Sequence, residues 1–459
     1  MFRCLVSDAS GVSSYIKRMS LESNLVSLPR GQQMRNLLVF AACTGLQYLA
    51  APINYVGLMQ APLFRELGAT DSIANLPATF YLGLTFSPVI FAWLIPYISW
   101  LKRNLVACYA ATAAAQALVA MCLHADLPDD VKIVMVIGQS ALFGITGPAA
   151  IAFLWEILGR GTDESRRGLA LGLAFGVGPV LAVLGSRLSG EILAGSLGIA
   201  RESLIVPRFA ILYAFAAMLM ALAAILSSFV IVPRPQVELD RRPFTQAVFG
   251  GLLAFLRNPV LRAATIVTIA LYAGNTIISN MSLYSEQVYG DSPSRHAGQQ
   301  SEWRFAFKMV AGLALGRLLT QTNPKVGLLA TGSIFLSSVL FAMIATADNY
   351  ILVFGLYGAG ELIGVYAPNY ILSASGKNDM RRNLAFVTMM MAPAAPAGYV
   401  FGLISETAGE AWNKTIGYQL SFAACAAIML AGLLLAAIRL PARPRPEAGD
   451  QEHDSRQDG

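Results

Sequence analysis

Long apolar stretches separated by short polar connectors dominate the chain. A helix that crosses the hydrocarbon of a bilayer needs about 20 mostly apolar residues. The sequence contains twelve such stretches, which lie at residues 36–60, 71–98, 104–124, 131–158, 168–195, 208–232, 262–288, 304–321, 326–346, 349–373, 383–406 and 415–438. The pattern therefore predicts an all-α membrane protein with twelve transmembrane helices.

The connector at residues 233–261 divides these predicted helices into two groups of six. We therefore expect an N-terminal six-helix bundle at 36–232, a central cytoplasmic linker at 233–261 and a C-terminal six-helix bundle at 262–438. The mixed polar residues 1–35 predict a disordered cytoplasmic leader without a cleaved signal peptide. Met19 and Met34 are alternative starts, so this leader is expected to be disordered or absent. Residues 439–459, rich in Pro and charge, predict a disordered cytoplasmic tail.

Composition supports a bilayer as the solvent. Hydrophobic residues make up 56% of the chain, charged residues only 13%, and mean hydropathy is +0.57, whereas soluble domains carry about 25% charged residues. The net charge of +6 comes from scattered connectors, which argues against nucleic-acid binding. The five cysteines form no CxxC pair, so neither a disulfide framework nor a metal site is expected.

Lys and Arg are concentrated in alternate connectors, which predicts cytoplasmic termini. With this orientation, Arg304 and Lys308 at the start of the eighth span count with the outer loops. We expect a multi-pass protein of the cell (inner) membrane, in contact with lipid and monomeric.

An internal repeat indicates two pseudo-symmetric halves. Arg166-Arg167-x-Leu-Ala follows the fourth span, and Arg381-Arg382-x-Leu-Ala follows the tenth. Loops of this kind collect arginines in any case, but recurrence before the same helix of each half favours duplication.

The sequence at this point resembles the major facilitator superfamily (MFS). Arg257-Asn258-Pro259 resembles the stretch common before helix 7 in that superfamily, and the Gly-rich helix at 168–195 resembles that of its drug antiporters. Ile98 and Ser140 depart from the family pattern, which has an aspartate and an arginine there. The resemblance implies a transporter of two bundles, with gating-loop residues that are Lys102, Arg103, Arg166, Arg167, Arg381 and Arg382.

Glu361 is the main candidate for a functional charge, because a carboxylate in mid-span is costly unless it has a purpose. It lies among small residues in Gly358-Ala359-Gly360-Glu361. One hypothesis is a protonatable carboxylate that couples protons to substrate, which is how lactose permeases, members of the resembled superfamily, use a glutamate of helix 10. The alternative is a structural ion pair with Lys308 or Arg187.

Two further sets of polar residues lie within spans. Arg187 and Glu191 are one turn apart and are expected to pair with each other, while Lys308 either faces inward or snorkels outward. The resembled fold lines its central cavity with helices 1, 4, 7 and 10, which gives as substrate-cavity candidates Gln47, Asn54, Tyr55, Gln139, Asn275, Ser279, Asn280, Tyr284, Tyr366 and Asn369.

These features predict a secondary active transporter that moves a small solute by alternating access, with a polar neutral, sugar-like solute favoured and proton coupling as a hypothesis. Two alternatives stay open: a drug or metabolite efflux antiporter, and a transporter-shaped scaffold that no longer transports. No motif indicates an enzyme or a bound cofactor.

Overall fold

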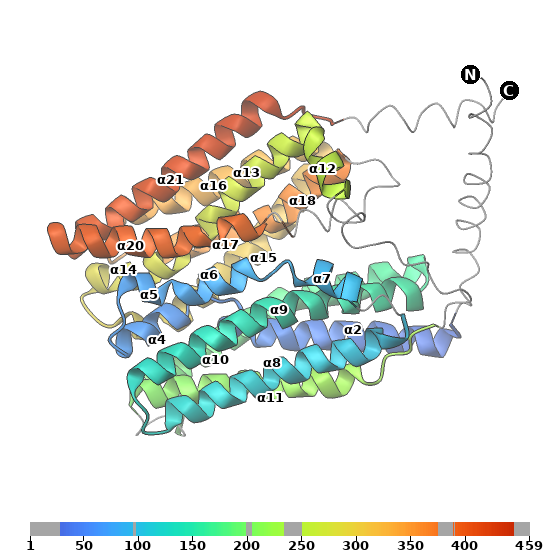
Figure 1. Cartoon of the computed structure of the whole chain (residues 1–459), viewed down its shortest axis with the longest axis horizontal. Coiled ribbons are helices and arrows are strands. Elements are labelled where there is room, and N and C mark those ends of the chain that lie inside the picture. Colours follow the sequence, from blue (N-terminus) through green and yellow to red (C-terminus); the bar gives the residue numbers. More distant parts are fainter. Residues whose placement is uncertain are drawn as a thin grey trace, which may run out of the picture.

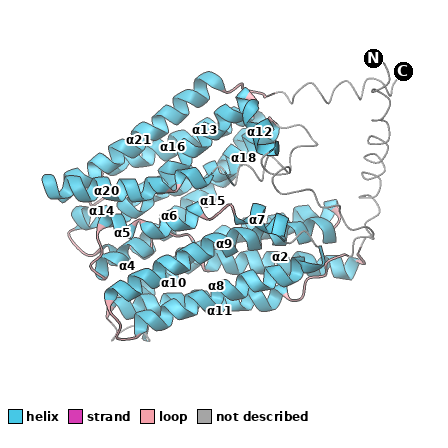
Figure 2. Ribbon diagram, viewed as in Figure 1, coloured by secondary structure: helices cyan, strands magenta, loops and turns pink. Residues whose placement is uncertain are grey.

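The computed structural model describes residues 28–94, 98–198, 204–233, 250–374, 389 and 391–444. Within these residues every regular element is a helix, and the helices are joined by short loops (Figure 2). The predicted disordered leader and tail lie almost wholly outside the described residues, except that the first helix already begins at Arg30.

The helices form two bundles that lie side by side (Figure 1). The first bundle, drawn in blue to green, contains α2 (Arg30–Leu49), α3 (Ala51–Asn54), α4 (Gln60–Glu66), α5 (Asp71–Ala74), α6 (Leu76–Gly83), α7 (Ser87–Leu94), α8 (Leu101–His124), α9 (Asp129–Gly161), α10 (Glu164–Ala194) and α11 (Ile205–Ser227). The second bundle, in yellow to red, contains α12 (Gly250–Arg257), α13 (Pro259–Asn275), α14 (Ile278–Tyr289), α15 (Ala297–Gln321), α16 (Pro324–Ile344), α17 (Ile351–Gly360), α18 (Ile363–Ser373), α20 (Pro396–Ala411) and α21 (Lys414–Arg439).

Nine helices in the described part of the chain are long and apolar enough to cross a membrane. The other predicted spans correspond to α2, α15 and α20. The α2 helix begins with basic residues and ends at Leu49, α15 carries several charges along its length, and α20, which follows a 3-10 turn at Ala392–Ala394, has only 16 residues. Each of these three helices is therefore shorter or less apolar than the nine.

Asparagine caps fix where several helices of the second bundle begin. The Asn258 side chain accepts hydrogen bonds from the backbone N–H groups of Val260 (2.9 Å) and Leu261 (3.1 Å), and Pro259 occupies the first turn. An asparagine N-cap followed by proline satisfies exposed N–H groups and needs no donor from the proline. This explains locally why Arg257-Asn258-Pro259 starts a helix, and Asn323-Pro324 repeats the device at α16.

The first, seventh and tenth predicted spans are interrupted near their middle, and the second also breaks, between α6 and α7. The first breaks between α2 and α3, the seventh between α13 and α14, and the tenth between α17 and α18. Pro52 lies at the break in the first span. Glu361 lies at the break in the tenth span, directly after the last residue of α17. Broken helices at mid-membrane are the usual places where transporters expose backbone and side chains to a ligand.

The two bundles meet along several pairs of helices, one of which is α4 with α14. α10 packs against α15, and α5 and α6 pack against α20. At the first contact the Ser186 and Ser301 hydroxyls lie 2.8 Å apart. A Cβ atom on Gly298 would lie only 2.2 Å from the Cα of Gly190, so glycine is required for this close approach.

Polar contacts also join the bundles at one end of the molecule. We call this the distal end, because α2 begins and α21 ends at the opposite, proximal end (Figure 1). Arg65, at the end of α4, lies 3.1 Å from Glu286 of α14 and donates to the Tyr418 hydroxyl of α21 (2.9 Å) and to Asp71 (3.1 Å). The backbone N–H of Ser72 donates to Glu406 of α20 (3.1 Å). These contacts, the distal network, hold the two bundles together at that end.

Candidate functional site

A cluster of three charged side chains lies between the helices of the second bundle. Arg304 and Lys308 are one turn apart on α15, and both reach Glu361 at the break between α17 and α18. Arg304 Nε donates to Glu361 Oε2 (2.9 Å), and its Nη2 donates to Oε1. Lys308 Nζ donates to Oε2 (3.3 Å). The exposed fraction of the side chain is 4% for Arg304, 6% for Glu361 and 20% for Lys308, so the Arg304–Glu361 pair is buried and Lys308 is the more exposed of the two cations.

Small residues let α17 approach α15 closely enough for this pairing. A Cβ atom on Gly358 would lie 1.9 Å from the carbonyl oxygen of Arg304. On the other side, a Cβ atom on Gly360 would lie 2.5 Å from the Cβ of Phe335 on α16. The glycines beside Glu361 therefore determine how near the carboxylate lies to its cations.

Aromatic rings enclose the two cations. The Arg304 guanidinium carbon lies 5.3 Å from the centre of the Tyr357 ring and 5.5 Å from that of Tyr55. Lys308 Nζ lies 5.1 Å from the centre of the Tyr55 ring. Cations within about 6 Å of a ring centre are attracted by its electron-rich face. Tyr55 belongs to the first bundle, so the charged cluster is completed across the boundary between the bundles.

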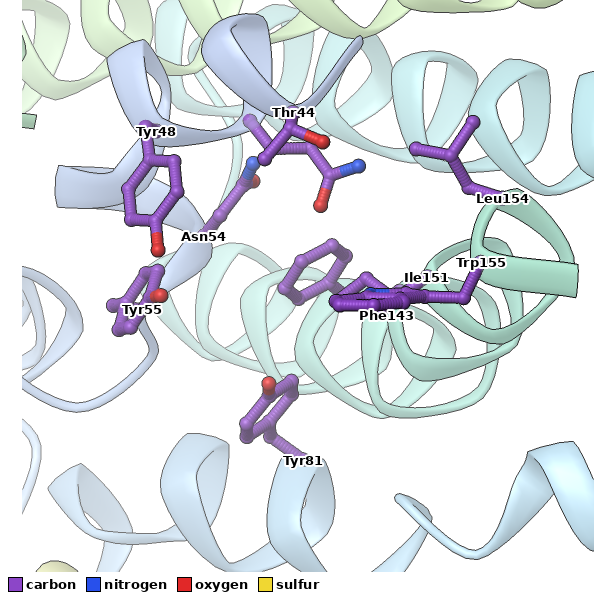
Figure 3. A pocket seen from close by; sticks show the side chains of 11 residues that line it. Thr44, Tyr48, Asn54, Tyr55, Tyr81, Phe143, Ile151, Leu154 and Trp155 are labelled. Atoms are coloured by element: carbon purple, nitrogen blue, oxygen red, sulfur yellow. The ribbon is translucent and has the colours of Figure 1, made fainter. Parts of the chain in front are cut away.

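A cavity of about 230 Å³ begins at Tyr55 and extends into the first bundle. The Tyr48 and Tyr55 rings lie to one side of it, and Phe143 and Trp155 lie to another (Figure 3). Its lining residues are Thr44, Gln47, Tyr48, Asn54, Tyr55, Tyr81, Phe143, Gly147, Ile151, Leu154 and Trp155. The space is thus aromatic, with a few amide and hydroxyl groups, and a cationic cluster adjoins it at Tyr55.

Three of the predicted cavity residues line this space: Gln47, Asn54 and Tyr55. Gln47 donates to the hydroxyl of Tyr109, and the Asn54 side-chain oxygen accepts from Gln116 (2.6 Å). Both amide groups therefore already form hydrogen bonds with neighbours within the first bundle.

The predicted residues of α13 and α14 lie elsewhere, in contacts between helices. Asn280 donates to the carbonyl of Phe401 and the hydroxyl of Ser421 (3.0 Å each) and accepts from Asn75 (2.7 Å). Ser279 donates to the carbonyl of Gly57 (3.4 Å).

Aromatic contacts and a buried hydrogen bond account for two more of these residues. Tyr284 packs against the rings of Tyr350, Tyr418 and Phe422. The side chain and backbone oxygens of Asn275 accept from Tyr357, at 3.0 and 2.5 Å.

The remaining cavity candidates lie within single bundles. Gln139 is buried in α9 away from the cavity, and its side-chain oxygen has no hydrogen-bond partner among the described residues. Tyr366 packs with Leu315 and Leu362. Asn369 accepts a hydrogen bond from Ser373 on its backbone oxygen (2.8 Å).

The other predicted charges are placed as follows. Arg187 and Glu191 are both exposed on α10, and within the described residues no ion pair of 4 Å or less joins them. Of the gating-loop residues, Lys102 is half-buried, and Arg103 lies over the Trp100 ring (5.3 Å). The side chains of Arg166 and Arg167, and the whole of Arg381 and Arg382, lie outside the described residues.

Arg304 is the residue that the sequence reasoning placed wrongly. It was assigned to the edge of an eighth span beginning at 304, but α15 begins at Ala297, and Arg304 is only 3% exposed. The polar first turns of α15 pack against α10 rather than lipid, so hydropathy sets the start too late. The i,i+4 spacing of Arg304 and Lys308 was the available signal, since such residues share one helix face.

Comparison with known proteins gives the same fold. The sequence profile of the Major Facilitator Superfamily matches residues 37–399, whereas none of the curated proteins matches the chain. A mutant of the nucleoside transporter NupG superposes with a TM-score of 0.67 at 13% identity, covering 88% of this chain and 100% of that one. A D-xylose–proton symporter gives 0.65 at 13% identity, with coverage of 90% and 98%. The peptide transporter POT in complex with sulfate gives 0.62 at 12% identity, with coverage of 90% and 96%.

At these identities the structural likeness establishes the fold alone. The profile match covers most of the chain, including the Glu361 region, the first bundle from residue 37 and the second bundle as far as residue 399. The chain belongs to the Major Facilitator Superfamily.

Proposed function

We propose that this chain is a secondary transporter that moves a small organic solute across the membrane by alternating access. The observation that carries the proposal is the Arg304–Lys308–Glu361 cluster of the second bundle, whose two cations lie against Tyr55, a lining residue of the cavity in the first bundle. Buried ionisable groups at such a place mark substrate or ion pathways in membrane proteins. The similar solved structures are named as nucleoside, xylose–proton and peptide transporters, which supports a small organic solute.

The contacts between the bundles suit a rocking motion. The glycine contact between α10 and α15 lets two helix backbones slide past each other with little side-chain interlocking. The distal network, by contrast, consists of ion pairs and hydrogen bonds that form or break as a group. Breaking this network while the proximal end closes would expose the cavity to the opposite side of the membrane.

Glu361 is the proposed site of proton coupling. A proton on this carboxylate removes the negative charge that holds Arg304 and Lys308, so protonation and rearrangement of the cluster are linked. The excess of Lys and Arg in alternate connectors supports placing both termini in the cytoplasm.

The experiment is to place a single cysteine at Thr44, a lining residue outside the charged cluster, in a chain whose five native cysteines are replaced by alanine. A membrane-impermeant methanethiosulfonate is applied to right-side-out and inside-out vesicles. We expect modification from both sides. We also expect a ratio between the sides that changes from pH 5.5 to 7.5, and that ceases to change in Glu361→Gln.

An exposed position gives the control. Asp163→Cys, in the exposed turn before α10 at the proximal end, should react from one side only. Modification of Thr44→Cys from a single side at both pH values would refute transport and favour a scaffold.

A further inference from the structure

Given the proposed transport function, we infer that the transported solute is an organic anion: a carboxylate attached to a small aromatic body. The carboxylate binds Lys308, and the aromatic body occupies the cavity between Tyr55 and Trp155. Charge, donor geometry and cavity lining lead to this substrate class.

The charged cluster holds two cations and one anion. Arg304, Lys308 and Glu361 are bonded only to one another among the ionised side chains that the structure describes around them. When all three groups are ionised, a surplus of one positive charge lies in the second bundle, where it faces Tyr55 of the first. A surplus charge in a region of low dielectric attracts an opposite charge strongly and repels a like one.

Lys308 is the cation with donors to spare. Arg304 grips Glu361 through two nitrogens and is almost fully buried. Lys308 gives Glu361 a single hydrogen bond of 3.3 Å, and a fifth of its side chain is exposed. An ammonium group has three N–H donors, so two remain for a ligand. An incoming carboxylate at this point would receive charge-assisted hydrogen bonds.

The adjoining cavity is built to hold an aromatic body. Tyr55 forms part of its lining and lies against the Lys308 ammonium. From there the walls continue through Tyr48, Tyr81 and Phe143 to Trp155 (Figure 3). Its volume of about 230 Å³ is below the range of about 300–1,000 Å³ that is typical for drug-sized ligands. A single-ring or fused-ring acid suits this size, and ring stacking would add to its binding.

The polar side chains that suggested a neutral, sugar-like solute are largely committed elsewhere. Asn280 makes its hydrogen bonds to the protein across three helices, and the Asn275 and Asn54 oxygens have internal partners. Recognition of a sugar needs several free donors and acceptors around one space. The surplus positive charge likewise disfavours the organic cations that many drug effluxers carry.

The experiment is a thermal-shift titration of the full-length, detergent-solubilised protein with four matched pairs of acid and amide. The pairs are benzoate and benzamide, phenylacetate and phenylacetamide, nicotinate and nicotinamide, and indole-3-acetate and indole-3-acetamide. Within each pair size and aromatic surface are nearly equal, so a difference reports the charge. We expect at least one acid to stabilise the protein saturably while its amide has no effect.

Variants then locate the charge. Lys308→Gln should weaken binding of that acid about ten- to a hundredfold, the equivalent of losing a hydrogen bond to a charged group. Lys308→Arg, which keeps the charge, should retain binding. Binding by Lys308→Arg would also show that the protein still folds when residue 308 is substituted. Lys132→Gln removes a lysine at the start of α9 that pairs locally with Asp129, and should bind like the parent protein.

Three results would overturn the assignment: amides that stabilise as well as acids, acid binding that survives Lys308→Gln, or no response to any of the four acids. Each is distinguishable from a failure of the transport proposal. If Thr44→Cys still reacts from both sides, transport stands and only the substrate class is wrong. If it reacts from one side, the transport proposal fails whatever ligand binds.

Discussion

The Glu361 carboxylate pairs with two cations of one helix, so the loss of Glu361 and the loss of either cation have different consequences. If Arg304 is lost, Lys308 remains as a partner for the carboxylate. If Glu361 is lost, both cations are left without an anion inside the bundle. Removing one partner of a buried ion pair costs about 3–5 kcal/mol, because the remaining charge stays buried and uncompensated.

We therefore predict that Glu361→Gln destabilises the protein more than Arg304→Gln does. Glu361→Gln should fall in the range of about 3–5 kcal/mol, and the double variant should recover part of that loss because it leaves only Lys308 unpaired. The measurement is the unfolding free energy, or the apparent midpoint where unfolding is irreversible, in one detergent at pH 7.5.

A partly exposed pair gives the comparison for this prediction. Lys132→Gln, which breaks the pair with Asp129, should cost no more than about 1 kcal/mol. A larger loss for Arg304→Gln than for Glu361→Gln would show that Lys308 does not support the carboxylate.

At the scale of single residues, the sequence predicts Glu361 as a charged residue within a span, and it gives Lys308 as one of its possible partners. It did not point to Arg304, because hydropathy cannot distinguish a polar turn in water from a polar turn packed against another helix. The sequence also could not show that the Asn280 side chain is hydrogen-bonded to Asn75 and Ser421. Hydrogen-bond partners far apart in sequence depend on the fold, and composition carries no signal for them.

At the scale of the element, α10 and α15 bring two helix backbones close together at Gly190 and Gly298. We predict that Gly298→Ala destabilises the protein by about 1–3 kcal/mol, the usual cost of overpacking, because the added Cβ would meet the Cα of Gly190 at 2.2 Å. Thermal unfolding of the purified variant measures the effect.

The same helix supplies a matched control. Gly312, further along α15, has open space where a Cβ would lie, so Gly312→Ala should be neutral or slightly stabilising, as expected from helix propensity. Equal effects of the two substitutions would mean that the loss reflects α15 itself and not its contact with α10.

The helix breaks show what a sequence can and cannot predict about elements. Pro52 lies just after the break in the first span, where a proline removes a backbone donor and clashes with the preceding turn. Pro148 and Pro179, however, lie inside continuous helices. The break at Thr276 has no proline at all, so packing rather than local chemistry produces it.

At the scale of the molecule, the apolar stretches and the connector after the sixth span predicted an all-helical membrane protein, and membership of the Major Facilitator Superfamily confirms that reading. The structure adds what no stretch of sequence states, namely the end of the molecule at which polar contacts join the two bundles. The distal network joins α4 to α14 and α21, and its residues are hundreds of positions apart. Their meeting depends on the packing of both bundles.

Double electron–electron resonance distances between paired spin labels test alternating access most directly. The distal pair is Asp130→Cys with Lys414→Cys, and the proximal pair is Arg103→Cys with Arg262→Cys; all four positions are exposed, and each pair spans the two bundles. We predict a second population in which the distal distance lengthens while the proximal one shortens. Arg65→Gln should enlarge this population, by up to about fivefold for a partly exposed ion pair worth about 1 kcal/mol. A single unchanging distance at both pairs, in the parent protein and in Arg65→Gln alike, would contradict the account.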